Sequence, residues 1–389
     1  MQLQRAGMSA VADNGGRPPG QIVLVLQGGG ALGAYHAGVF QALHEAGIEP
    51  DWVIGTSIGA INAALIAGNP PAQRLERMRE FWRLVEWRDV FGFGGVLPSW
   101  VAGPFANLDT IARGVGGFFD LNPFALFGVR TPLGLDNAAF YRTMPLRETL
   151  TKLVDFDLIK RGPMRLTVGA VNARTGAMRY FDSKLETLAA EHVMASGALP
   201  PAFPAVRIDG EPYWDGGIYS NTPIEAVLDD NPRKSSTIFN VHLWNPSGSE
   251  PQSIWDVLGR QKEIQYSSRA VSHVNRQKQI HRLRHVISTL AQYIPEEARN
   301  DETVRELMSW GCKTTIHIVR LLAPRLDGED HTKDIDFTPH GIRERWTAGY
   351  ADTQHAIARR PWVCEIDPLE GILLHDHVST LKMGSDPNF

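Results

Sequence analysis

The sequence predicts an α/β protein built on a mainly parallel sheet, and patterns near the start of the chain lead to that prediction. Residues 21–27 (QIVLVLQ) are rich in β-branched residues and lack polar alternation, as is typical of a strand buried on both faces. A helix-compatible stretch follows over 31–46 and ends at Gly47. Residues 52–54 form a second short strand pattern, and 58–67 can form a second helix. This alternation of strands and helices implies parallel neighbouring strands.

The later elements continue this architecture with weaker patterns. Residues 75–87 have the spacing of an amphipathic helix. Shorter runs indicate two strand pairs, 166–171 with 178–181 around a turn at Thr175-Gly176, and 203–208 with 212–214. We expect 238–243 to be the last central strand.

The composition excludes several classes of protein. With 389 residues, 43% hydrophobic and 21% charged, the chain can bury a large core. Its formal net charge of -4 creates no field that would favour nucleic acid as a partner. The two cysteines, Cys312 and Cys364, cannot build a disulfide scaffold or a C-x-x-C metal site. They fit a reducing compartment, and a single pairing between them stays open.

The start of the chain carries no recognisable targeting pattern. Residues 1–20 are polar, rich in glycine and proline, and lack the apolar core of a signal peptide, so we expect a disordered arm. No run of about 18 apolar residues occurs, so no membrane-spanning helix is expected. We therefore expect a cytoplasmic location.

Two regions have unusual compositions. Residues 91–135 contain nine glycines, seven phenylalanines and four charged residues. This composition is typical of a long buried loop with short helices, or of an apolar lid or acyl-chain wall. Residues 254–294 combine long helical spacing with a basic face, which is either solvated or in contact with anionic lipid or phosphate head groups. The basic residues are Arg260, Lys262, Arg269, Arg276, Lys278, Arg282 and Arg284.

A glycine-rich loop lies between the first strand and the first helix. Gly28, Gly30 and Gly33 match G-x-G-x-x-G, but the acidic residue that dinucleotide binding needs is misplaced, because Asp51 precedes the second strand instead of following it. A phosphate-binding P-loop would need G-K-[ST], which the segment after Gly30 lacks. Consecutive glycines at a helix start can instead point backbone N–H groups at an oxyanion.

Ser57 lies in Gly55-Thr56-Ser57-Ile58-Gly59, a G-x-S-x-G pattern between a strand and a helix. Small residues two before and two after the serine allow a strained turn that exposes the hydroxyl above the sheet. The pattern therefore predicts a nucleophile, which needs a base. The candidate bases are His192, His242 and His340 in a triad, or Asp215 acting directly from Tyr213-Trp214-Asp215-Gly216-Gly217.

The chain resembles the patatin-like phospholipases. The resemblance rests on GGGALGAYHAGVFQAL, GTSIGAINAALIAG and YWDGGIYSNTP, in this order, with Ala195–Pro200 and Phe203-Pro204 ahead of the aspartate. It covers roughly residues 20–245. The extension after Pro251 is similar to one found on some bacterial patatin-like proteins.

The resemblance implies a three-layer α/β/α sandwich with a mainly parallel sheet, plus a mostly helical C-terminal extension. It divides the chain into a disordered arm (1–20), a catalytic domain (21–250, with 91–135 as an apolar lid or insert) and the extension (251–389). It implies a Ser–Asp dyad, a metal-free site and no cofactor. The implied site residues are Ser57 as nucleophile, Asp215 as general base, Gly28, Gly29 and Gly30 as the oxyanion hole, and Gly33, Gly55, Gly59, Gly216 and Gly217 in supporting positions.

The function expected from the resemblance is hydrolysis of acyl esters of phospholipids or lysophospholipids through an acyl-enzyme. Two alternatives stay open: a Ser-His-Asp carboxylesterase acting on other esters, and an inactive lipid-binding protein. The expected partner is a lipid acyl ester, with a peripheral contact to anionic membrane as a further hypothesis. No nucleic acid is expected, and protein partners are not predicted.

Overall fold

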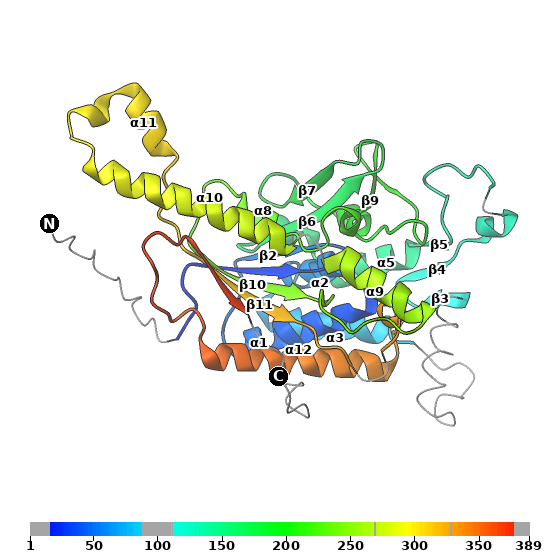
Figure 1. Cartoon of the computed structure of the whole chain (residues 1–389). Coiled ribbons are helices and arrows are strands. Elements are labelled where there is room, and N and C mark those ends of the chain that lie inside the picture. The colour runs from blue at the N-terminus through cyan, green and yellow to red at the C-terminus, as the bar shows by residue number, and fades with distance from the viewer. Residues whose placement is uncertain are drawn as a thin grey trace.

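The computed structural model describes residues 16–87, 110, 112–128, 130–267, 270–326 and 329–376. A nine-stranded sheet lies at the centre, and helices cover both of its faces (Figure 1). The expected three-layer α/β/α architecture with a helical C-terminal region is therefore confirmed.

The elements have the following bounds. The strands of the large sheet are β1 (Gln21–Leu26), β2 (Trp52–Gly55), β6 (Arg165–Asn172), β7 (Met178–Asp182), β8 (Val206–Ile208), β9 (Glu211–Asp215), β10 (Ser236–His242), β11 (Ile316–Leu322) and β12 (Ile372–Asp376). The helices are α1 (Ala34–Glu45), α2 (Ile58–Ala67), α3 (Pro71–Leu84), α5 (Met144–Leu153), α6 (Phe156–Arg161), α7 (Ala190–Ser196), α8 (Glu225–Leu228), α9 (Ile254–Ser267), α10 (Ala270–Leu290), α11 (Glu302–Ser309) and α12 (Pro339–Arg359). Short 3-10 turns include η1 (Gly30–Gly33), η2 (Pro123–Phe127), η3 (Gly216–Ile218) and η6 (Lys333–Ile335).

The sheet order β12-β11-β10-β1-β2-β6 is parallel throughout, as the alternation of strands and helices predicted. The carboxyl ends of these strands therefore lie at one edge of the sheet, where ligand sites of open α/β sheets are usually found. The glycine loop follows β1 and the G-x-S-x-G turn follows β2, so both lie at this edge.

The strands around β6 bring two distant segments together. β2 pairs with the first half of β6, with Gly55 opposite Val168, and β9 pairs antiparallel with the second half, with Asp215 opposite Ala170. β7 occupies the other edge of β6, because it pairs with residues that β2 and β9 also use. β2 and β9 thus run toward each other along a shared edge. Their carboxyl ends meet, and Ser57 lies beside Asp215.

Each face of the sheet has its own apolar core. Alternate residues of β1 divide between the two faces, with Leu24 and Leu26 on one and Val23 and Val25 on the other. The first face packs against α1, α2, α3 and α12, and the second packs against α8 and α10. Burial on both faces explains why β1 lacks polar alternation.

The C-terminal region adds to the central sheet. β11 and β12 extend it beyond β10, so the expectation that 238–243 is the last central strand was wrong. α12 lies along α1 (Figure 1), and the Tyr35 hydroxyl donates a 2.9 Å hydrogen bond to Asp352 Oδ2 between the two helices. The backbones approach closely, because a Cβ on Gly38 would lie 1.9 Å from the Trp346 carbonyl oxygen.

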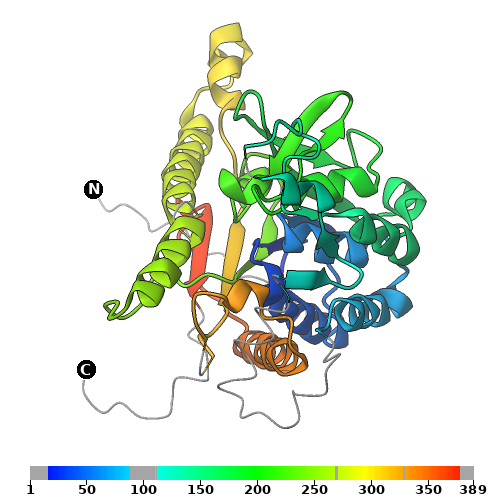
Figure 2. The ribbon, with the colours of Figure 1, turned by 90° about the vertical axis from the view of Figure 1, so that its right-hand side faces the viewer.

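The same region also forms a projecting arm. α10 runs along the sheet and extends past it, so α11 lies beyond the end of the sheet (Figures 1 and 2). Within the described part of the chain, no helix has the length and apolar character needed to cross a membrane.

Part of the unusual segment 91–135 lies outside the described residues, namely 91–109, 111 and 129. The remainder forms a small antiparallel sheet of β3 (Gly114–Val115) and β4 (Phe119–Leu121) with β5 (Tyr141–Arg142), followed after β4 by η2. Phe119 stacks edge-on with Tyr141 and Phe203, at centroid distances of 4.8 and 5.1 Å. This segment therefore contributes a compact aromatic cluster.

Candidate active site

A cavity of about 160 Å³ opens at the carboxyl edge of the sheet. Its polar lining includes Gly28, Gly29, Gly30, Ser57, Asp215 and Asn221, so the cavity brings together the candidate residues of all three sequence motifs. The apolar lining is formed by Ile58, Ile61, Phe118, Phe119, Tyr141, Leu199, Phe203, Trp244, Tyr266, Ile335 and Phe337.

Ser57 occupies a strained turn between β2 and α2. Its φ of 57° and ψ of -126° are unusual for a residue with a Cβ, as the nucleophile-elbow pattern predicts. The flanking glycines permit this turn. A Cβ on Gly55 would lie 2.2 Å from the Gly59 carbonyl oxygen, and a Cβ on Gly59 would lie 2.2 Å from the Leu26 carbonyl oxygen. The Ser57 amide is held by the carbonyl and hydroxyl oxygens of Ser196, both at 3.1 Å.

Asp215 is buried at the end of β9, with 2% of its surface exposed. The Ser57 hydroxyl lies close enough to lower the pKa of its carboxyl group, and the Gly217 amide donates a 2.7 Å hydrogen bond to Asp215 Oδ1. Burial raises the pKa of Asp215 to about 7, although the contacts with Ser57 and Gly217 act in the opposite direction. A carboxyl group with this pKa can accept a proton from a serine hydroxyl better than an ordinary aspartate near neutral pH.

The glycines behind Asp215 allow its close approach to the sheet. A Cβ on Gly216 would lie 2.4 Å from the carbonyl oxygen of Gly169 in β6. A Cβ on Gly217 would lie 2.8 Å from Asn221 Oδ1. The sharp turn after the aspartate therefore requires glycine at both positions.

The glycine loop contributes backbone amides at the start of η1 and α1. Among the described residues, the amides of Gly29 and Gly30 have no hydrogen-bond acceptor, and both glycines line the cavity. The Gly28 amide, in contrast, donates a 3.1 Å hydrogen bond to the carbonyl oxygen of Asn221. The Gly28 amide is therefore already used in a hydrogen bond within the protein. The amides of Gly29 and Gly30 remain as the candidates for the oxyanion hole. Gly33 packs against Ile58, since a Cβ there would lie 2.5 Å from the Ile58 side chain.

None of the described histidines lines the cavity. His192 accepts a 3.0 Å hydrogen bond from the Ala189 amide through Nδ1, and His340 lies exposed on α12. His242 is buried beside Asn240, and burial lowers its pKa to about 3. The three histidines proposed as triad members are therefore all placed away from Ser57.

The C-terminal region completes the cavity wall. Tyr266 comes from α9, Asp334 and Ile335 come from η6, and Phe337 follows them. η6 packs directly on the glycine loop, because a Cβ on Gly30 would lie 2.2 Å from the Asp334 carbonyl oxygen. The extension is thus part of the site.

A buried ion pair supports this wall. Lys333 Nζ lies 2.7 Å from Glu263 Oε1, and both side chains are 8% exposed. Lys333 also lies 5.4 Å from the centre of the Trp244 ring, whose indole N–H donates a 2.8 Å hydrogen bond to the Gly28 carbonyl oxygen. The pair therefore links the extension to the glycine loop through Trp244.

The predicted basic face of 254–294 is partly used for internal contacts. Lys262 pairs with Asp334 at 2.8 Å, and Lys278 pairs with Glu370 at 3.0 Å. Arg269 lies outside the described residues.

Sequence reasoning missed Asn221, Trp244, Tyr266 and the residues of η6 as parts of the site. Asn221 stood in the quoted YWDGGIYSNTP segment, six residues after Asp215, so its position was available as a signal. Trp244 directly follows the predicted strand 238–243 at the carboxyl edge of the sheet. The wall from the extension has no local signal, because it forms only through tertiary packing.

Comparisons with known proteins agree with these motifs. A family model described as patatin-like phospholipase matches residues 24–228, and a second, described as patatin phospholipase, matches 264–369. Lysophospholipase NTE1 of Candida glabrata is 27% identical over 240 residues, which cover 61% of this chain and 11% of that protein. The mouse (Mus musculus) patatin-like phospholipase domain-containing protein 6 is 49% identical over 61 residues, 16% of this chain.

The chain spans only 4% of the length of the mouse relative. Among solved structures, VipD from Legionella pneumophila aligns with a TM-score of 0.38 and 17% identity, covering 92% of this chain and 71% of that one. Because the first family model covers more than half of the sequence, this chain belongs to the patatin-like phospholipase family.

Proposed function

We propose that the protein hydrolyses acyl esters of phospholipids or lysophospholipids through a dyad of Ser57 and Asp215. The observation that carries this proposal is that the strained Ser57 and the buried carboxyl group of Asp215 line the same cavity with aromatic walls. A nucleophile, a base and an apolar surface for an acyl chain are thereby present together.

In the proposed acylation step, Ser57 Oγ attacks the ester carbonyl carbon while Asp215 accepts the hydroxyl proton. The amides of Gly29 and Gly30 donate hydrogen bonds to the oxyanion that forms on the carbonyl oxygen. When this intermediate collapses, the alcohol leaves with the proton from Asp215, and the acyl group remains on Ser57.

In the proposed deacylation step, water attacks the acyl-serine carbonyl carbon and gives its proton to Asp215. Collapse of the second oxyanion breaks the bond to Ser57 Oγ, which recovers the proton as the fatty acid leaves. A single carboxyl group serves both steps, because it returns to its starting state after each one.

The apolar wall supports a lipid substrate. Phe118, Phe119 and Phe203 form a contiguous aromatic cluster beside Ser57, with ring centroids 5.1 to 6.0 Å apart. Within the proposed mechanism, this surface holds the acyl chain and excludes water from the ester.

A peripheral contact with membrane belongs to the same proposal. α9, α10 and α11 carry large exposed apolar side chains beside basic ones, a composition found at membrane surfaces. The apolar residues are Ile254, Trp255, Val257, Leu258, Ile264, Val271, Leu283, Leu290, Leu307 and, on the flanking turns, Tyr293 and Trp310. Flotation with anionic and zwitterionic vesicles tests this contact, and absence of binding to both would contradict it. A cytoplasmic location is supported by two free cysteines.

The proposed reaction is tested with a chain-length series of p-nitrophenyl esters and with a phospholipid. Ser57→Ala and Asp215→Asn should each lose at least about 10³-fold in kcat/KM, because each removes a dyad member. His242→Ala and the exposed His340→Ala should retain activity. A serine-directed fluorophosphonate should label the wild type and spare Ser57→Ala. Full activity of Asp215→Asn, or loss of activity in a histidine variant, would contradict the dyad and favour a Ser-His-Asp triad. An unlabelled, inactive wild type would favour a lipid-binding protein.

A further inference from the structure

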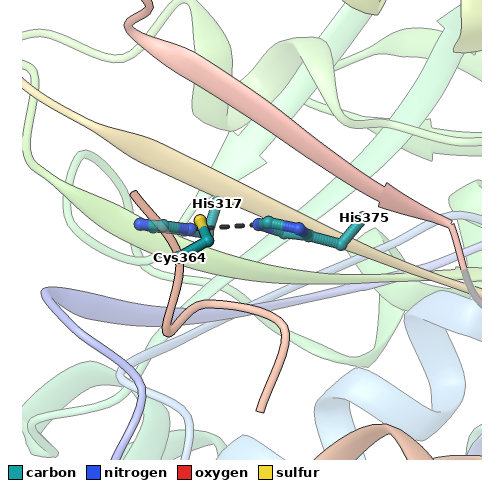
Figure 3. Close-up of side chains that lie close together, drawn as sticks. All are labelled: His317, Cys364 and His375. Atoms are coloured by element: carbon teal, nitrogen blue, oxygen red, sulfur yellow. Dashed lines mark hydrogen bonds between the residues drawn. The ribbon is translucent and has the colours of Figure 1, made fainter. Parts of the chain in front are cut away.

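Three potential metal ligands lie together in the C-terminal region, away from the cavity (Figure 3). His317 belongs to β11, His375 belongs to the neighbouring β12, and Cys364 lies in the segment between α12 and β12. His317 Nδ1 and His375 Nε2 are 3.1 Å apart, and the three ligand atoms lie within 4.8 Å of one another.

The register of the two strands explains why the histidines meet. Val319 lies opposite His375 in the parallel pair β11–β12, so His317 and His375 are offset by two residues and point to the same face of the sheet. Val319 belongs to the apolar core between the sheet and α12, so the two histidines point to the face of the sheet that α12 covers. The chain leaving α12 is anchored by Trp362, which is buried against Phe239, and it then brings Cys364 over the two rings.

Metals bind the neutral form of imidazole and the deprotonated form of a thiol. A cation at this site would therefore displace the proton shared by His317 Nδ1 and His375 Nε2 and the proton of the Cys364 thiol.

We propose that His317, Cys364 and His375 bind a divalent transition-metal ion, with Zn²⁺ as the ion that best suits two imidazoles and a thiolate. Bonds of about 2.0–2.3 Å in a tetrahedral site place the ligand atoms about 3.3–3.7 Å apart. The 3.1 Å between the two histidine nitrogens and the limit of 4.8 Å for all three ligand atoms bracket this range, so small side-chain rotations bring the three donors to one ion. A water molecule takes the fourth position.

The surroundings are compatible with access of an ion. His317 lines a surface hollow of about 480 Å³, together with Asp367 and Glu370. The bound ion would tie the segment after α12 to the edge of the sheet. None of the three ligands lines the cavity that contains Ser57, so the role is structural and separate from ester hydrolysis.

The test is a titration of the chelator-treated full-length protein with Co²⁺, whose absorption reports both a thiolate ligand and tetrahedral geometry. We expect saturation at one equivalent, with a thiolate-to-cobalt charge-transfer band and intense visible bands. Cys364→Ser should lose the charge-transfer band. Cys312→Ser is the matched control, since it removes the other cysteine of the chain, and it should keep the band.

Direct binding of Zn²⁺ gives an independent measurement. Competition with a chromophoric chelator should yield a dissociation constant that rises more than about 100-fold in His375→Gln, a change at the strand edge that retains a polar side chain. Circular dichroism of each variant checks its fold. If the folded wild type binds neither Co²⁺ nor Zn²⁺ in stoichiometric amount, or if only Cys312→Ser loses the band, the proposal is overturned. The contact between His317 and His375 is then only a hydrogen bond between rings.

Discussion

Gly28 and Asn221 hold each other through two reciprocal hydrogen bonds across 193 residues of sequence. The Gly28 amide donates to the Asn221 carbonyl oxygen, and Asn221 Nδ2 donates to the Gly28 carbonyl oxygen, both at 3.1 Å. Gly28 opens the glycine loop, while Asn221 follows the turn that carries Asp215. The two halves of the proposed catalytic site are therefore fastened to each other directly.

The first prediction concerns this connection. Asn221→Ala removes one of the two hydrogen bonds and also the 3.2 Å bond from Asn221 Nδ2 to the Tyr266 carbonyl oxygen. We expect kcat on a p-nitrophenyl ester to fall by about tenfold to 100-fold with little change in KM, because the amides move relative to Ser57. Steady-state kinetics at 25 °C measures the effect.

A similarly buried asparagine provides the control. Asn172 stabilises the β6–β7 turn by accepting from the Arg174 and Thr175 amides and is remote from the cavity. Asn172→Ala should lower the melting temperature while leaving kcat close to the wild-type value. Equal losses of kcat in both variants would show that general destabilisation, not the link to Gly28, controls activity.

The second prediction is the pH dependence of the reaction. Asp215 acts as a base only when ionised, and burial raises its pKa to about 7. We expect kcat/KM to increase about tenfold per pH unit below that value and to level off above it. Continuous titration of the released acid measures this profile. A rise centred near pH 4 would argue against Asp215 as the buried base.

The third prediction concerns stability. Because the folded-state pKa of Asp215 lies above the ordinary value of 3.8, the wild type loses stability as pH rises from about 4 to 7. Asp215→Asn does not titrate. Its stability relative to the wild type should therefore increase across this window, by on the order of 4 kcal/mol between the plateaus. Urea unfolding at several pH values measures the difference. Ser57→Ala keeps the carboxyl group, so its stability should also decrease as the pH rises. A stability difference between Asp215→Asn and the wild type that does not change with pH would contradict the prediction.

The fourth prediction tests the contact between the glycine loop and the extension. Gly30 has a φ of +55°, and its Cβ would lie 2.2 Å from the Asp334 carbonyl oxygen. Gly30→Ala should therefore displace η6, lower kcat at least about tenfold and destabilise the fold by about 1–3 kcal/mol. Gly176→Ala is the control, since it has a φ of +70° with nothing within 4 Å of the added Cβ. Gly176→Ala therefore introduces backbone strain without a steric clash. An equal loss of kcat in this control would contradict the claim that the clash with Asp334 lowers the activity of Gly30→Ala.

The fifth prediction addresses the acyl-chain wall. Phe119→Ala removes the ring between Tyr141 and Phe203 and enlarges the cavity beside Ser57. We expect the optimum of a p-nitrophenyl ester series to move toward longer or bulkier acyl groups. Phe127→Ala, in the same segment but 71% exposed, should leave the series unchanged. An unaltered profile in Phe119→Ala would place the acyl chain elsewhere.

Local patterns were sufficient to predict the turns at Ser57 and Asp215, whereas the choice of Asp215 over a histidine as the base came from the family resemblance. The elbow at Ser57 and the turn at Asp215 each depend on a few consecutive residues, so glycine spacing alone indicates them. β1 and β2 were predictable because burial on both faces produces uninterrupted apolar runs.

Features that depend on distant packing were not predictable in this way. The apolar run of β11 is interrupted by His317 and Arg320, and its addition to the sheet follows only from pairing with β10. The hydrogen bond of the Gly28 amide could not be predicted, because it depends on the position of Asn221 in the folded chain. Tyr266 and Phe337 reach the cavity through the packing of helices onto a completed sheet, which no sequence window contains.

The pairing of α12 with α1 has a consequence for biosynthesis. Asp352 is translated 317 residues after its partner Tyr35, which takes on the order of half a minute at ordinary elongation rates. The face of α1 that α12 covers stays exposed on the nascent chain throughout that interval, and the edge of β10 stays exposed until β11 follows, so both are available to chaperones and to aggregation. The ribosome also releases η6 late, and the cavity gains its last wall only then. The proposed active site is therefore complete only after η6 has been synthesised and has packed against the glycine loop.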